Sequence, residues 1–182
     1  LVLPEEMLHL TELRLTGNRM RDLGFLARTV APMEVYLDEN DMEEAVLPPG
    51  AASVVGLALR GNRLSVLQIP AGYGRLKWLW VSYNQLTHLA LAPDLGSLAS
   101  VWAESNRLAR LQLPTGLSRL AQVDVSWNPL EDLRLASGLP ALNSLRLQAT
   151  LMRTLVIPPG AEELKFVGID GTLITTVVAP ED

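Results

Sequence analysis

One feature constrains the fold of this sequence more than any other: asparagine recurs at a fixed interval of 22 residues. Each asparagine lies in the same apolar pattern, as in residues 76–91, where two leucines and a valine precede Asn84 and three leucines follow it. The asparagines in this register are Asn18, Asn40, Asn62, Asn84, Asn106 and Asn128, and threonine takes the next two steps at Thr150 and Thr172. A period without insertions over eight units indicates one supersecondary element stacked repeatedly on itself.

The pattern L-x-x-L-x-L-x-x-N-x-L resembles the leucine-rich repeat, and the resemblance covers the whole chain. It implies a β-rich solenoid with a curved parallel sheet on its concave face, short extended or 3₁₀ segments on its convex side, and little α-helix. It also implies that each asparagine turns inward and bonds the backbone of adjacent turns, which satisfies a buried amide. Thr150 and Thr172 lose one hydrogen-bonding arm, so we expect the C-terminal turns to be held less firmly.

Proline and glycine predict how each repeat turns on its convex side. Proline ends most of the second apolar runs and glycine follows two residues later, as in Pro70 and Gly72. Proline removes a backbone donor and glycine reaches positive φ, so this pair favours a corner over a helix. The form L-x-L-P-x-G-L is similar to bacterial leucine-rich repeats, including those of secreted effector proteins.

The repeat runs through residues 1–182 without a change in composition, which predicts a single leucine-rich repeat domain of about eight 22-residue repeats. Leu1, Leu3 and Pro4 already occupy positions in the middle of a repeat, and the sequence stops in mid-repeat at Pro180 and Asp182. Solenoids need polar caps at their ends, and none is recognisable. We therefore expect a fragment of a longer array without its caps.

Composition narrows the classes of partner. The longest apolar runs fall far short of the roughly 20 residues of a membrane-spanning helix, so we expect no membrane insertion. The absence of cysteine excludes disulfides, thiol catalysis and cysteine-bound metal. A net charge of −5 with scattered basic residues argues against nucleic acid. The compartment stays undetermined, with a secreted or surface-associated bacterial protein favoured over a cytoplasmic one.

Aromatic residues gather at one place on the predicted concave face. Side chains alternate along a strand, so Trp78, Trp80 and Trp102 point outward from two neighbouring strands, with Trp80 and Trp102 about 4.8 Å apart. An apolar centre with a polar rim is typical of a binding hot spot. The predicted partner-binding residues are Trp78, Trp80, Trp102, Tyr36, Arg60, Tyr83, Glu104, Asp124, Trp127 and Arg146.

Three alternatives to a protein-binding surface stay open. The indoles can stack on one another and merely stiffen the sheet, or Trp78 and Trp102 can stack against a sugar. The chain can also be a structural or adhesive array that associates with itself through open ends. The favoured hypothesis is a non-catalytic protein–protein recognition module, such as the target-binding part of a bacterial effector or surface protein; the sequence does not identify the partner.

Motifs for catalysis or metal binding find little support. His9 and His88 lie at different phases of the repeat, and no nucleophile-elbow, zinc-protease or Walker motif is present. Gly72-Tyr73-Gly74 lies at a corner and opens no helix. The acidic run 38–44 suggests a calcium loop by composition, but Asn40 belongs to the ladder and Met42 to the core. We predict no enzymatic activity, no cofactor and no metal.

Overall fold

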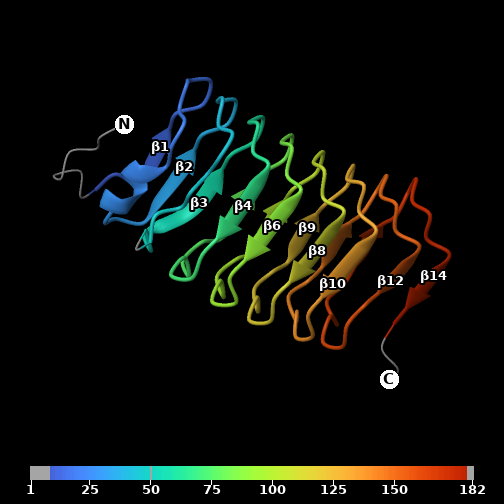
Figure 1. Cartoon of the computed structure of the whole chain (residues 1–182). Coiled ribbons are helices and arrows are strands. Elements are labelled where there is room, and N and C mark those ends of the chain that lie inside the picture. The colour runs from blue at the N-terminus through green and yellow to red at the C-terminus, as the bar shows by residue number, and fades with distance from the viewer. Residues whose placement is uncertain (1–8, 50, 180–182) are drawn as a thin grey trace.

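The computed structural model describes residues 9–49 and 51–179; the terminal residues Leu1, Leu3, Pro4, Pro180 and Asp182 lie outside this part. The chain winds into a stack of turns, and each turn contributes one strand to a long parallel sheet on the concave face (Figure 1). The strands of this long sheet are β1 (Glu12–Arg14), β2 (Met33–Tyr36), β3 (Val54–Ala58), β5 (Trp78–Trp80), β7 (Ser100–Trp102), β9 (Gln122–Asp124), β11 (Ser144–Arg146) and β13 (Phe166–Gly168).

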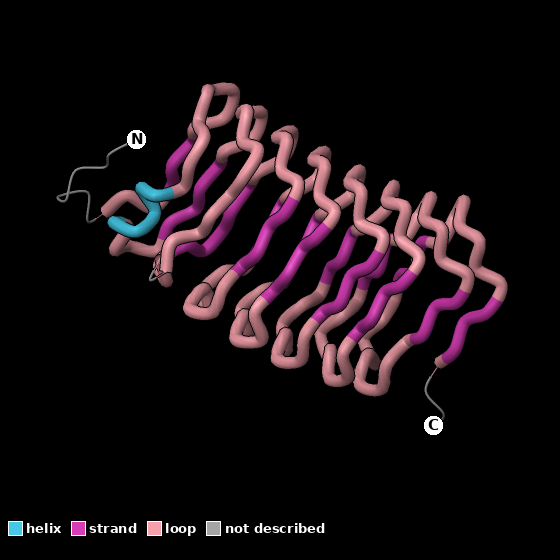
Figure 2. The backbone as a smooth tube through the Cα atoms, in the orientation of Figure 1, coloured by secondary structure: helices cyan, strands magenta, loops and turns pink. Residues whose placement is uncertain are grey.

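The convex side carries extended segments of three or four residues that pair two by two, β4 with β6, β8 with β10 and β12 with β14. Their bounds are β4 (Val66–Ile69), β6 (His88–Leu91), β8 (Arg110–Leu113), β10 (Asp132–Leu135), β12 (Thr154–Val156) and β14 (Thr176–Val178). Within the described residues the one helix is the 3₁₀ helix η1 (Gly24–Arg28), coloured cyan in Figure 2. The predicted solenoid with a helix-poor convex side is therefore confirmed.

No helix in the described ranges has both the length and the apolar character needed to cross a bilayer.

Strand pairing follows the 22-residue period. Trp80 lies beside Trp102, and Trp102 in turn lies beside Asp124. The one irregularity lies between β2 and β3, where Met33 pairs with Val54 but Glu34 pairs with Gly56. Because equivalent residues lie side by side, each repeat position forms a row that runs along the solenoid.

The rows of leucine, valine and isoleucine form one continuous core between the two faces. In β5, for example, Leu79 is fully buried while the tryptophans on either side of it point to the concave face. The corner glycines Gly72, Gly116, Gly138 and Gly160 have φ between 79° and 96°, as the proline–glycine corners predict.

Tyr73 is part of this core. Its side chain is fully buried and its hydroxyl donates a hydrogen bond to the carbonyl oxygen of Pro48 at 2.8 Å. Burial raises the pKa of the Tyr73 phenol to about 12. The Gly72-Tyr73-Gly74 sequence is thus an anchored corner of the solenoid.

The asparagine ladder joins successive turns. The Nδ2 group of Asn84 donates to the carbonyl oxygens of Val81 and Ser82 in its own turn and of Leu59 in the preceding turn, at 2.8–3.2 Å. Its Oδ1 accepts a hydrogen bond from the backbone N–H of Leu64 at 3.0 Å. Equivalent bonds between turns are made by Asn40, Asn62, Asn106 and Asn128.

The threonines that continue the ladder make fewer bonds. Thr150 Oγ1 donates to the carbonyl oxygen of Leu147 at 2.8 Å, and Thr172 Oγ1 donates to that of Ile169 at 2.8 Å. Both acceptors lie in the threonine's own turn. The predicted loss of one hydrogen-bonding arm is confirmed for these two positions, and the structure shows that the bond to the preceding turn is the one lost.

Candidate functional site

Four aromatic side chains meet on the concave face and are called the aromatic cluster here: Tyr36, Trp78, Trp80 and Trp102. The rings of Trp78 and Trp80 stack with centroids 4.3 Å apart, and those of Trp80 and Trp102 stack at 5.1 Å with an angle of 12° between planes. Tyr36 lies 5.4 Å from Trp78. Offset stacking of this kind stabilises aromatic pairs beyond the area they bury. Because the rings cover one another, all four are half-buried and not fully exposed.

Small residues on β3 make room for the aromatic cluster. A Cβ atom placed on Gly56 would lie 2.0 Å from Cε2 of Trp78, so the indole lies directly over the glycine. Ala58, the next concave-face residue of β3, pairs with Trp80 and is fully buried. Period alone places both residues outward, but they form a floor beneath the larger rings.

Two guanidinium groups flank the cluster. Arg60 Cζ lies 4.6 Å from the ring centroid of Trp80, and Arg14 Cζ lies 4.5 Å from that of Tyr36. Arg60 is also held by Asp38, whose Oδ2 lies 3.1 Å from Arg60 Nη2. The predicted residue Arg60 therefore contacts the cluster, and Arg14, which sequence reasoning did not include, extends it.

The indole N–H groups of Trp80 and Trp102 are buried without a hydrogen-bond partner in the described structure. An unpaired buried donor costs about 1–3 kcal/mol. Ring contacts, and not polar anchors, therefore hold these two side chains in place. The stacking envisaged in the stiffening alternative is present, and the four aromatic residues stay partly exposed.

A polar hollow of about 550 Å³ adjoins the cluster on the side of β9 and β11. It brings together five of the predicted residues, while the other five lie in or against the aromatic cluster. Arg146 Cζ lies 5.4 Å from the ring centroid of Phe166, on β13. The hollow is lined by Tyr83, Glu104, Asp124, Ser126, Trp127, Arg146, Gln148, Ala149, Asp170 and Gly171.

A row of hydrogen-bonded polar side chains borders the concave face, two residues before the ladder positions. Its members bond in pairs across adjacent turns: Asp38 with Arg60, Ser82 with Glu104, and Ser126 with Gln148. Ser82 and Ser126 are buried, so their hydrogen bonds hold the side chains of Glu104 and Gln148 in place. This row of polar pairs was not predicted from the sequence. A comparison of the residues two positions before each ladder residue would have indicated it.

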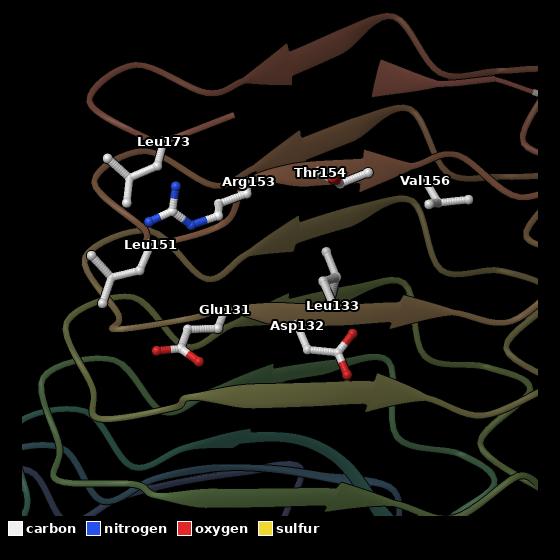
Figure 3. A pocket seen from close by; sticks show the side chains of 8 residues that line it. All are labelled: Glu131, Asp132, Leu133, Leu151, Arg153, Thr154, Val156 and Leu173. Atoms are coloured by element: carbon white, nitrogen blue, oxygen red, sulfur yellow. The ribbon is translucent and has the colours of Figure 1, made fainter. Parts of the chain in front are cut away.

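The convex side carries a separate hollow of about 610 Å³ between β10 and β12 (Figure 3). Leu151 and Leu173 are half exposed there, at a repeat position that holds the polar residues Gln85 and Arg107 in earlier turns. No predicted site residue lies in this hollow. Its lining consists of Glu131, Asp132, Leu133, Leu151, Arg153, Thr154, Val156 and Leu173.

The histidines do not converge on any site. His88 lies on β6 and shares a 3.0 Å hydrogen bond with Thr87 Oγ1, whereas His9 lies before β1. Over residues 9–49 and 51–179, no three histidine, aspartate or glutamate side chains form a group able to hold a metal ion. In the acidic run, Asp38 and Asp41 instead form ion pairs with Arg60 and Arg63.

Solved structures with the same fold are leucine-rich repeat proteins. The leucine-rich repeat domain of APL1B matches 99% of this chain and 54% of its own, with a TM-score of 0.75 and 19% identity. YopM, described as a leucine-rich effector protein from Yersinia pestis, matches 92% of this chain and 56% of its own, with a TM-score of 0.60 and 18% identity. The plant peptide hormone receptor RGFR1, solved in complex with RGF2, matches 96% of this chain and 33% of its own, with a TM-score of 0.59 and 20% identity.

The chain thus spans about half the length of the first two of these proteins. No protein-family model and no curated protein sequence matches it. The repeat, the parallel long sheet, the asparagine ladder and these structural neighbours agree with one another. The chain has the fold of the leucine-rich repeat proteins.

Proposed function

We propose that this chain is a non-catalytic module that recognises a protein partner through the aromatic cluster and the adjoining polar hollow. The observation that carries the proposal is the cluster itself, four half-buried aromatic rings gathered on one face beside charged side chains. Tryptophan, tyrosine and arginine dominate the residues whose truncation weakens protein interfaces most. The long sheet holds these side chains in fixed positions, which lowers the ordering cost of binding.

The structural neighbours support a recognition role at the level of the fold. RGFR1 was solved with RGF2 bound, and a further neighbour is the LRIM1/APL1C complex, so proteins with this fold engage protein or peptide partners. YopM is described as an effector. For this chain, a role as the target-binding part of a bacterial effector or surface protein is part of the proposal.

The test uses peptides selected from a displayed random library on the immobilised chain. We expect the Trp80→Ala variant to remain folded. Its binding of the selected peptides should be weaker by about 2 kcal/mol or more, close to 30-fold in affinity. Val66→Ala is the control, because Val66 is an exposed apolar residue on β4 of the convex side, away from the cluster and the hollow. Equal affinity of the selected peptides for wild type and Trp80→Ala would remove the proposal.

The glycan alternative finds less support in the geometry. Sugars stack on free ring faces, but Trp78 and Trp102, the residues of this alternative, each stack against the ring of Trp80. A glycan array read by tryptophan fluorescence tests this alternative. Quenching by any glycan that Trp80→Ala abolishes would restore it.

Self-association is a second candidate, favoured by exposed apolar side chains on the last described turns. Val167, Leu173, Val177 and Val178 are 38–55% exposed there. Apolar surface of this kind suits contact with a second copy of the chain. Sedimentation over a range of protein concentrations distinguishes the two functions, because end-to-end stacking gives oligomers that grow with concentration.

A further inference from the structure

The residues directly before the ladder positions share an unusual backbone conformation. In each of the eight repeats this residue has φ between 53° and 70°, the left-handed region. Glycine adopts this region without strain, whereas a bulky side chain there is an outlier. This row, called the edge row, consists of Gly17, Glu39, Gly61, Tyr83, Ser105, Trp127, Ala149 and Gly171.

Tyr83 and Trp127 are the two bulky members of the edge row, and nothing in the core requires them. Their side chains are 62% and 66% exposed, so burial does not offset the backbone strain. Neighbouring repeats fill the same position with glycine, serine or alanine. The fold imposes this conformation in every repeat, so an exposed aromatic residue there carries strain that a glycine would avoid, which points to a functional role.

Their spacing leaves room for a ligand group between the two side chains. Tyr83 and Trp127 lie two turns apart in the stack, about 10 Å at the usual strand separation. Ser105, the edge-row residue of the intervening turn, is too small to fill the space between them. Both aromatic residues line the same polar hollow. The space suits one planar group with a ring on each side.

The charge beneath this space is negative. Glu104 directly precedes Ser105, and its Oε2 accepts a hydrogen bond from the buried Ser82 hydroxyl, which fixes the carboxylate in place. Asp124 and Asp170 line the same hollow, and within the described structure none of these three carboxylates forms an ion pair. Arg146, the one cation in the hollow, stands near Phe166. The hollow therefore has an excess of carboxylates facing an open space.

We propose that Tyr83, Trp127 and Glu104 form an aromatic slot for an arginine side chain of the protein partner. A guanidinium group is planar, stacks on aromatic faces and donates paired hydrogen bonds to a carboxylate, which a lysine ammonium group does not match. This inference rests on the proposed function and adds the chemistry by which one part of the site selects its partner.

The test uses N-acetyl-arginine methylamide as a probe, with its citrulline and lysine counterparts as controls for charge and planarity. Binding is followed in two-dimensional NMR spectra through the indole N–H signal of Trp127 and, in Trp127→Gly, through the backbone N–H signal of Ser105. We expect saturable binding in the millimolar range, at least about fivefold tighter for arginine than for citrulline or lysine. No saturable shift, or equal binding of arginine and citrulline, would overturn the inference.

Variants separate the slot from general folding effects. Trp127→Gly places glycine in a left-handed position, so we expect the thermal midpoint to hold or rise while arginine binding falls at least about tenfold. Glu104→Gln should keep the fold and abolish the preference for arginine over citrulline. Glu39→Gly is the matched control, since it makes a comparable change in the edge row outside the slot and should leave binding unchanged. Wild-type arginine binding by Trp127→Gly would contradict the slot.

The outcome for the slot is distinguishable from that for the proposed function. If selected peptides lose affinity for Trp80→Ala but bind Trp127→Gly as tightly as wild type, the slot is refuted and the recognition function stands. If arginine binds in the slot while no selected peptide depends on Trp80, the recognition function fails as proposed and the slot remains a small-cation site.

Discussion

The indole of Trp78 lies directly over Gly56, so closely that a Cβ atom on Gly56 would come within 2.0 Å of Trp78 Cε2. The two residues occupy the same position in adjacent repeats and are partners in the sheet register. Glycine weakens a strand because it adds no packing and costs more entropy to order. The glycine is therefore best explained by the large side chain that lies over it.

Gly56→Ala should disturb the aromatic cluster. The added methyl group forces the Trp78 ring away from its neighbours, and we expect a loss of about 1–3 kcal/mol in the free energy of unfolding together with a weaker near-UV circular dichroism signal. Urea denaturation and the dichroism spectrum measure both effects.

Gly168→Ala is the matched control for this prediction. A Cβ there would meet the amide end of the Gln148 side chain at 2.3 Å, and moving that amide loses its hydrogen bond with Ser126 but displaces no aromatic ring. Similar losses for the two variants would show that the cluster is not tightly packed over Gly56. The double variant Gly56→Ala, Trp78→Ala should lose less than the sum of its single changes.

Removing one asparagine of the ladder should destabilise the whole solenoid. In Asn84→Ala, three buried carbonyl groups and one buried N–H lose their side-chain partner. We therefore expect the free energy of unfolding to fall by about 3 kcal/mol. Asn84→Thr should lose less, because Thr150 shows that a hydroxyl still bonds within its own turn.

Asn18→Ala tests the same prediction at an exposed position. Asn18 donates to the carbonyl oxygens of Leu15 and Thr16, both in its own turn and accessible to water. We expect a loss below about 1 kcal/mol in urea denaturation, because water replaces exposed hydrogen bonds. A loss as large as that of Asn84→Ala would contradict the importance of bonds between turns.

Tyr73→Phe should change how stability depends on alkaline pH. The phenol has a pKa of about 12 when folded and about 10 when unfolded. The unfolded chain therefore loses its proton first, and wild-type stability should decline as pH rises from about 10 to about 12. The variant lacks this group and should show a shallower decline.

At neutral pH the same variant should be less stable by about 1 kcal/mol, because the Pro48 carbonyl oxygen loses its donor. Denaturation series at neutral and alkaline pH measure both effects. Tyr83→Phe, a change at an exposed phenol, is the control and should keep the wild-type stability at neutral pH. If the free energy of unfolding of Tyr73→Phe fell with pH in parallel with wild type across this range, the alkaline decline would not come from the buried Tyr73 phenol.

The sequence was sufficient to predict the fold because the repeat fixes which side chains are buried. The row of Asn84 and the alternation around Leu79 determine the sheet, its register and its core without any long-range information. The corners were predictable for the same reason, since proline and glycine restrict or free φ locally.

Contacts between side chains on the concave face were harder to predict. Alternation placed Trp78 and Trp80 outward, but their stacking over Gly56 depends on rotamers and on the volume of neighbouring residues. The edge row left a signal in the glycines at positions 17, 61 and 171, which lie two and then five repeat steps apart. These glycines indicate a position of positive φ. The aromatic residues at the same position, Tyr83 and Trp127, are what point to a function there.

The most direct test of concave-face recognition is a two-dimensional NMR titration of the chain with a selected peptide. The chain has four tryptophans, three in the aromatic cluster and one in the slot, so the four indole N–H signals report on the proposed site alone. We predict that the Trp102 signal and at least one other indole signal shift on binding, while the backbone signals of β8 and β10 do not. Shifts concentrated on the convex strands with unchanged indole signals would contradict the proposed recognition surface.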